Sequence, residues 1–219
     1  MQASVRKSPL ERKKALASLG LSDELLSVAI TKGEVARDSC TDNDPPNAPG
    51  FDAWARTVRA LRETLIPKGW TRNDDAMLST VVSPDGKLAI LVVAGDEGVG
   101  DADKIPRTKY PRGTATTAAV NRNQRSLFPE ENKAREEAEA AEEKKKKQIT
   151  WMLLRRRSKD GDSVLSELSL PASMTKGGEV TRWLTRIILE PIAIEPTVEI
   201  EDGQANDAID VPVRRRSNS

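Results

Sequence analysis

The chain of 219 residues contains no histidine, a single cysteine and few aromatic residues. Without histidine, Ser-His-Asp and Cys-His catalysis is excluded, and so are the zinc sites that rely on imidazole ligands. Cys40 cannot form a disulfide within the chain, and a cysteine-rich metal site is excluded. Because aromatics make up 3% of residues, we expect no broad platform for stacking single-stranded bases. Any chemistry must therefore use carboxylates, lysine, tyrosine or an oxygen-bound metal.

Long apolar runs are also missing. None approaches the length of a membrane span, and the N-terminal segment lacks the apolar stretch of a secretory signal. We therefore expect a cytoplasmic protein with no membrane contact. The 35 basic and 34 acidic residues give a net charge of +1, but each sign gathers in separate segments. Apolar residues concentrate at 51–127 and 149–194, enough for a core of ordinary size with polar extensions around it.

Two short helices are predicted at the N-terminus. Ser8, Pro9 and Glu11 mark a helix start: the serine caps, the proline fits the first position and the glutamate completes a capping box. A glycine ends this helix, and Ser22 opens a second one. A DNA-reading helix-turn-helix would need cations or amides at the start of its second helix, which is acidic here. We expect a packed helical hairpin over 1–39 instead.

The middle of the chain carries clear signals for regular structure. Residues 40–50 are predicted to form a loop because three prolines interrupt them. Apolar residues then recur on one stripe over 51–66, a pattern typical of an amphipathic helix. Runs at 80–83 and 87–94 flank a Pro-Asp-Gly turn and predict a β-hairpin. Its second strand is apolar on both faces, so we expect it in the centre of a sheet.

Two further helices are predicted downstream of that strand. Thr114 or Thr116 can cap a helix that runs toward Leu127. The segment 130–147 has its acids first and its lysines last, and alanine is its only apolar residue. This order of charges is favourable in the field of the helix dipole, but the segment has no large apolar side chains to bury. We therefore expect an exposed charged helix that connects two halves of the fold.

Strand patterns return before the core ends. Turn signals divide 149–189 into three runs with strand character. The last run, 179–190, also fits a helical face, but its β-branched residues and flanking glycines and proline favour a strand. Residues 195–219 lack core residues and predict a disordered tail. We therefore predict an α+β core over 51–194. In it the amphipathic helix packs on one face of a mainly antiparallel sheet, and the N-terminal hairpin (1–39) docks on this core.

The loop after the central strand raises the question of a phosphate or metal site. Its glycines match neither the P-loop nor the dinucleotide fingerprint, and four acids stand where a phosphate would approach. Asp96 and Glu97 follow the strand end, where ligand sites of α/β sheets commonly lie. If the two carboxylates converge, they can hold Mg²⁺ and activate water. A nuclease or phosphoryl-transfer enzyme is then one hypothesis.

Basic residues after Gly100 suggest a different hypothesis. Two prolines stiffen this stretch, and Tyr110 offers a stacking surface among cations, which suits nucleic-acid backbone or an acidic protein surface. A second cationic stretch follows at 155–157, where alternate arginines share one strand face. The alternative for the loop is that its acids and bases pair with each other, and the alternative for 155–157 is that these arginines are solubilising residues on an exposed edge. The candidate contact residues are Lys104, Arg107, Lys109, Tyr110, Arg112, Arg122, Arg125, Arg155 and Arg157.

Binding without catalysis is the function that the sequence favours. We expect an intracellular accessory protein that contacts nucleic acid or an acidic partner through its basic loop and needs no cofactor. The enzyme hypothesis would require Mg²⁺ at Asp96 and Glu97. A third hypothesis is a protein-only adaptor that docks through the charged helix 130–147 and the tail.

Overall fold

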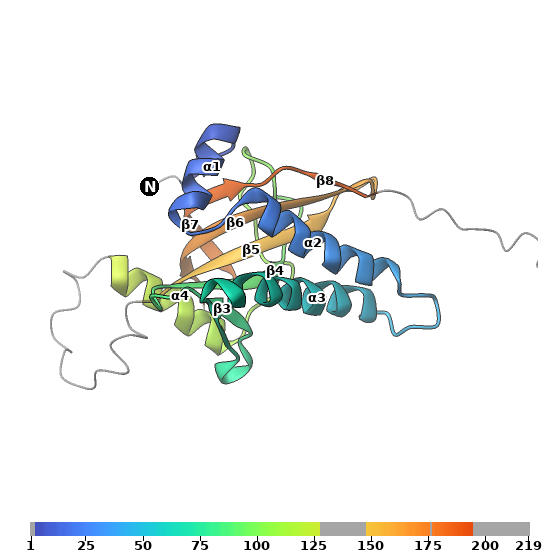
Figure 1. Ribbon diagram of the computed structural model, residues 1–219, viewed down its shortest axis with the longest axis horizontal. Helices are drawn as coiled ribbons and strands as arrows, with labels where there is room; N and C mark the ends of the chain where they lie inside the picture. Colours follow the sequence, from blue (N-terminus) through green and yellow to red (C-terminus); the bar gives the residue numbers. More distant parts are fainter. Residues whose placement is uncertain (1–2, 128–147, 176, 195–219) are drawn as a thin grey trace, which may run out of the picture.

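The computed structural model describes residues 3–127, 148–175 and 177–194 of the chain. Within these ranges, four α-helices accompany an eight-stranded sheet, which confirms the α+β class (Figure 1). The charged helix predicted over 130–147 and the tail predicted over 195–219 lie outside the described residues. In the part of the chain that is described, no helix has the length and apolar character needed to cross a membrane.

The elements follow one another closely along the chain. The helices are α1 (Pro9–Ser18), α2 (Asp23–Asp38), α3 (Ala48–Leu65) and α4 (Thr114–Leu127). Two 3-10 turns are η1 (Ile66–Lys68) and η2 (Asp75–Met77). The strands are β1 (Ser4–Arg6), β2 (Thr71–Asn73), β3 (Thr80–Val82), β4 (Leu88–Ala94), β5 (Ile149–Arg157), β6 (Ser163–Met174), β7 (Val180–Ile188) and β8 (Ile192–Ala193).

The sheet is mainly antiparallel, as predicted. Its strand order is β1-β7-β6-β5-β4-β3-β2, and β8 pairs with β6 beyond the end of β7. Among the described strands, the parallel pairs are β1 with β7 and β4 with β5. β4 lies inside the sheet and is buried over nearly its whole length, which its apolar run indicated. The strand preferred for 179–190 is confirmed, because Val180–Ile188 forms β7.

Local signals placed the first helix and the hairpin correctly. The N–H of Glu11 donates to Ser8 Oγ at 3.4 Å, and the Ser8 hydroxyl donates to the Glu11 carboxylate at 2.8 Å. Asp85 holds the turn before β4 by accepting from a hydroxyl and a backbone N–H. The predicted loop 40–50, by contrast, ends early, since α3 begins at Ala48. Proline is tolerated in the first turn of a helix, where the missing N–H has no partner to lose.

The predicted hairpin of the first two helices is replaced by a different pair. α2 packs along α3, and α1 lies against β7 (Figure 1). Gly33 permits the close approach of α2 and α3, because a Cβ at this position would lie 2.1 Å from Thr57 Oγ1 and 2.5 Å from the Ala53 carbonyl oxygen. The helical hairpin is therefore α2–α3, and α1 is a separate helix at the β7 end of the sheet.

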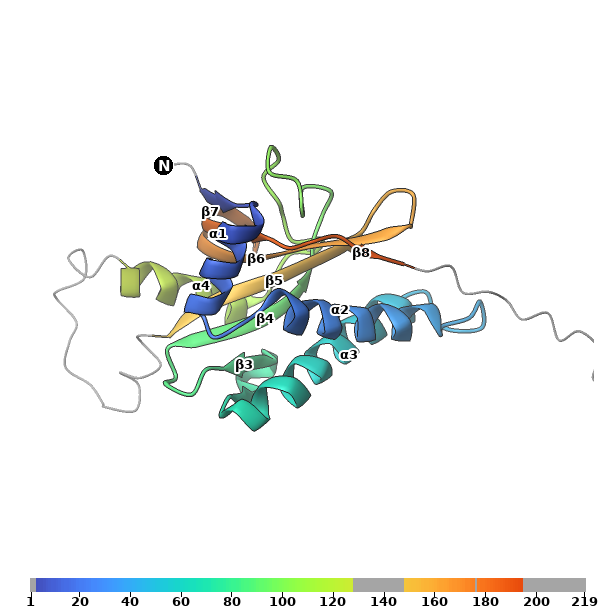
Figure 2. The same cartoon turned by 45° about the horizontal axis from the view of Figure 1, so that its top comes forward.

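Two apolar clusters lie on opposite faces of the sheet, because side chains alternate along each strand. On the helical face, α1, α2 and α3 cover one set of alternating residues of β4 and β5. On the loop face, Val99 and Val120 of the segment between β4 and β5 cover the other set. Figure 2 shows the chain after β4 leaving the sheet away from α2 and α3 before it enters α4. The segment that carries most of the predicted cations therefore lies opposite the helical layer.

Candidate functional site

The loop of residues 95–113, the basic loop, is held on the sheet by a buried ion pair. Arg186 of β7 and Glu167 of β6 are almost fully buried, and Nη2 of the arginine lies 2.6 Å from Oε2 of the glutamate. The same guanidinium also donates to three loop carbonyls, those of Gly98, Asp101 and Lys104. These bonds satisfy a buried charge that would otherwise be costly, and they direct loop carbonyls inward.

Further contacts hold the middle and the ends of the basic loop. The N–H of Lys109, late in the loop, donates to the carbonyl of Ala94 at the end of β4, at 2.8 Å, and so ties the two ends of the loop together. In its middle, Trp183 Nε1 donates to the carbonyl of Pro106 at 2.9 Å. At its end, the N–H of Arg112 donates to the carbonyl of Gly178 at 2.9 Å. The main chain thus fixes the loop, and its cationic side chains are not needed to hold it in place.

The first cations of the loop point to solvent. Lys104, Arg107 and Lys109 are exposed, and Tyr110 is 61% exposed. Lys104 Nζ lies 3.5 Å from Asp101 Oδ2, an exposed contact worth little in water. Lys109 Nζ lies 5.6 Å from the centre of the Tyr110 ring, so a cation and an aromatic face are offered together. Among the described residues, Arg107 and Lys109 make no ion pair.

Two arginines farther along are partly buried without an acid partner in the described part of the chain. In both Arg112 and Arg122, Nε is buried and lacks a hydrogen bond. Burial lowers the pKa of both guanidinium groups, because the charged form loses hydration. An incoming anion would supply the missing partner. Arg125 belongs to α4, but its side chain lies outside what the structure describes.

The arginines of β5 have a different environment. Arg155 and Arg157 share one strand face, and both turn toward Glu34 of α2. Arg155 Nη1 lies 2.6 Å from Glu34 Oε1, and Arg157 Nε lies 2.8 Å from Oε2. Arg157 also pairs with Asp38. Because the side chain of Arg155 is 5% exposed, this cluster fastens α2 to the sheet. Both arginines are therefore engaged by acids of the fold itself and are poor candidates for contact with an outside anion.

The two candidate metal ligands have separate partners. Asp96 Oδ1 accepts the N–H groups of Gly98 at 3.0 Å and Arg107 at 2.9 Å, which closes the base of the loop. Glu97 is exposed and its Oε2 lies 3.3 Å from Lys159 Nζ. In the described ranges, no group of three or more cysteine, aspartate or glutamate side chains is placed to hold a metal ion. The geometry therefore favours a structural role for Asp96.

Sequence patterns did not identify Glu167 and Arg186, the two residues that organise the loop. The available signal was a charged residue inside each of two mostly apolar strands, where burial requires a partner. Comparisons with family models, with curated proteins and with solved structures found no match. The functional assignment therefore depends on the geometry of the chain itself.

Proposed function

We propose that the protein binds the phosphate backbone of nucleic acid without catalysing a reaction on it. The contact surface, called the basic loop surface, consists of Lys104, Arg107, Lys109, Tyr110, Arg112 and Arg122. Apart from Lys104, its cations have no acid partner among the described residues. That observation carries the proposal, because free cations that neutralise phosphates displace the counterions condensed on the nucleic acid, and this release favours binding.

The fixed backbone supports the same function. A loop already held by Arg186, Glu167 and Trp183 has little main-chain freedom to lose on binding. Tyr110 beside Lys109 adds a surface on which one base can stack while the cation meets a phosphate. A single exposed tyrosine suits backbone contact with limited base stacking. Sequence-specific reading of bases would need more side chains directed at base edges.

A double variant tests this surface. In Lys109→Ala/Arg112→Ala, two phosphate contacts are lost, while backbone bonds of the loop remain. We expect affinity for fluorescein-labelled 20-nucleotide RNA, single-stranded DNA and duplex DNA to fall about tenfold at 50 mM salt. We also expect the slope of log K against log salt to shrink by about two. Fluorescence anisotropy from 50 to 200 mM salt measures both quantities.

A matched control separates local charge from net charge. Lys13→Ala/Arg182→Ala removes the same number of cations from exposed positions on α1 and β7. This control should bind like the parent chain, and all three proteins should melt at similar temperatures. Equal affinities and salt slopes for the two double variants would contradict the proposal. Tighter binding to polyglutamate than to any oligonucleotide would instead favour an acidic protein partner.

A further inference from the structure

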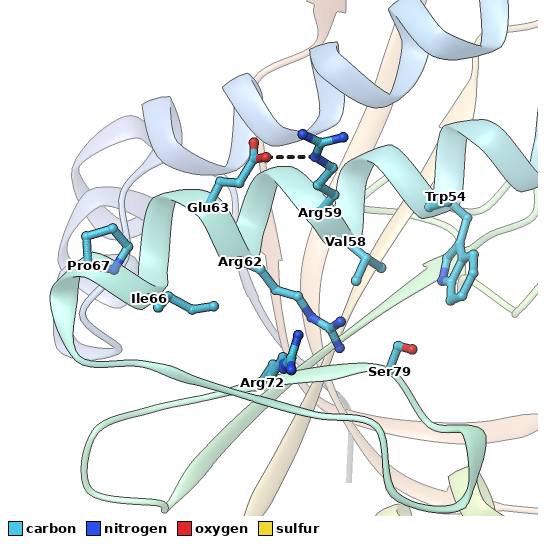
Figure 3. Close-up of a pocket in the computed structure, with 10 residues that line it drawn as sticks. Trp54, Val58, Arg59, Arg62, Glu63, Ile66, Pro67, Arg72 and Ser79 are labelled. Atoms are coloured by element: carbon cyan, nitrogen blue, oxygen red, sulfur yellow. Dashed lines mark hydrogen bonds and ion pairs between the residues drawn. The ribbon is translucent and has the colours of Figure 1, made fainter.

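A groove runs along the flank of α3 that faces β2 and β3 (Figure 3). Its volume is about 560 Å³, within the usual range of pockets that hold a small-molecule ligand. Trp54, Val58 and Ile66 follow one line along the helix and its continuation, and Ile66 is 44% exposed. The ring of Phe51 lies 5.7 Å from that of Trp54 and extends the apolar line. Val58 is buried and joins this line to the core, whereas Trp54 is half-buried and Ile66 is open to the groove.

Two arginines enter the groove from opposite walls. Figure 3 shows Arg62 of α3 and Arg72 of β2 with their guanidinium groups turned into the space between the two elements. Asp74 pairs with one of them: Arg62 Nη2 lies 2.6 Å from Asp74 Oδ1. The hydrogen bond from Arg62, with a smaller contribution from the Arg72 charge, lowers the pKa of Asp74. Two cations against one acid leave positive charge for a further anion.

Each of the two arginines keeps a donor group or a charge that no described residue satisfies. Nε of Arg62 is buried and makes no hydrogen bond. Arg72 is exposed and makes no ion pair with any described residue. Arg59, at the outer rim, is paired with Glu63 at 2.7 Å, an i,i+4 contact on the helix surface. The unpaired charge therefore lies at Arg72, beside a donor group of Arg62 that has no acceptor.

The sheet ends beside the groove at β2. This strand pairs with β3 on one side, and no described strand lies on its other side. The next turn contains Ala76 and Met77, which both have positive φ, at 53° and 61°. Met77 is 97% exposed. An unpaired edge beside an apolar, cationic groove is the arrangement that accepts an extended peptide as an added strand.

We propose that this groove is a docking site for an extended acidic segment of a partner protein, in which carboxylates alternate with aliphatic side chains. Its carboxylates would pair with Arg72 and with the free donor of Arg62, and its aliphatic side chains would cover Trp54 and Ile66. A nucleic acid fits less well, because the groove is lined by apolar side chains and the β2 edge offers backbone hydrogen bonds that a peptide strand can complete. This site is separate from the basic loop surface and does not depend on it.

The test uses a fluorescein-labelled peptide of twelve residues in which glutamate alternates with valine and isoleucine. The full chain should bind it, and Arg72→Glu should weaken binding about tenfold or more. Ile66→Ser should weaken it about threefold, since less apolar surface is covered. The control Arg182→Glu reverses an exposed arginine on β7 and should bind the peptide like the parent chain. Fluorescence anisotropy measures all four affinities.

Tryptophan quenching gives an independent readout of where the peptide lies. Trp54 is half-buried, whereas Trp70, Trp151 and Trp183 are 5%, 8% and 3% exposed. Acrylamide therefore quenches mainly Trp54, and the peptide should reduce this quenching in the parent chain. Reduced quenching that persists in Arg72→Glu with unchanged affinity would overturn the proposed site.

Other outcomes would overturn the proposal that the groove binds a partner peptide. Failure of the parent chain to bind, or equal binding of a peptide with lysine in place of glutamate, would overturn the proposal. So would a twelve-nucleotide oligonucleotide that displaces the peptide. The chain also has an acidic stretch of its own at 195–210, which could occupy the groove in place of a partner. The variant Glu199→Gln/Glu201→Gln/Asp202→Asn of the whole chain tests this possibility. If this variant binds the peptide more than about tenfold tighter, the occupant is that segment and the partner proposal fails.

Discussion

The basic loop and the arginines of β5 look alike as sequence, since each presents closely spaced cations. In the loop, the main chain bonds to Arg186 while Arg107 and Lys109 have no acid partner in the described residues. In β5, Arg155 and Arg157 converge on Glu34. The same charge density therefore leads to a candidate binding surface in one region and to an internal fastening in the other.

The difference between the two regions comes from distant acids. Glu34 stands 121 residues before Arg155 in the chain, and the packing of α2 on the sheet brings it into contact. No local property of an arginine shows whether such a partner exists. Charge runs therefore indicate where cations are, and only tertiary structure decides which of them remain available to an outside anion.

The largest effect should come from breaking the buried pair under the basic loop. Arg186→Met leaves Glu167 charged and buried at 0% exposure, and it frees three loop carbonyls. Removing one partner of such a pair costs about 3–5 kcal/mol of unfolding free energy. Urea denaturation measures this loss. Arg182→Met, an exposed arginine of the same strand, should change stability by less than about 0.5 kcal/mol. Similar losses in both variants would show that the pair does not hold the loop.

Breaking the β5 cluster should have the next largest effect. Glu34→Gln leaves Arg155 buried without a counter-charge and weakens the link to Arg157, so we expect a loss of about 2–3 kcal/mol. Glu63→Gln breaks an exposed pair with Arg59 and should have a much smaller effect, because solvent screens the two charges. Urea denaturation of the two variants compares them directly. If Glu34→Gln is no more harmful than Glu63→Gln, the cluster is not a fastening.

Local chemistry made much of the fold predictable. The cap at Ser8, the turn at Asp85 and the strand at 180–188 each depend on residues close in sequence. The pairing of α2 with α3 was not predicted, because several helices with apolar faces can pair in more than one way. Its one signal was Gly33, a glycine inside a helix, which marks a close approach but does not name the partner.

The candidate site was predictable to the same extent. Cations and the stiffening prolines of the loop are visible in the sequence, so its exposed surface could be proposed. The pair beneath it could not, since Glu167 stands opposite Ile188 in the sheet and meets Arg186 diagonally. The groove along α3 was missed for a related reason. Arg72 belongs to a three-residue edge strand, and only the packing of α3 brings Arg62 to face it.

The smallest expected effect comes from breaking the ion pair between Arg62 and Asp74, which is more exposed than the two buried pairs discussed above. Arg62 lowers the pKa of Asp74, whose side chain is 51% exposed. A carboxyl group with a lower pKa in the folded state stabilises the fold above its unfolded pKa of about 3.9. This contribution is lost as the pH falls through the lowered folded pKa. At pH 7, Asp74→Asn should therefore cost no more than about 0.5 kcal/mol after solvent screening.

Acid should remove this difference, because the parent chain also loses the Asp74 charge when its carboxyl group is protonated. Urea denaturation of the parent chain and of Asp74→Asn at pH 7 and at about pH 2 measures the change. A difference of equal size at both pH values would mean that shape or hydrogen bonding, rather than charge, links Asp74 to Arg62. A loss at pH 7 as large as that of Glu34→Gln would contradict the distinction between exposed and buried pairs. It would also show that Arg62 depends on Asp74 and is less available to an acidic peptide than its buried, unbonded Nε indicates.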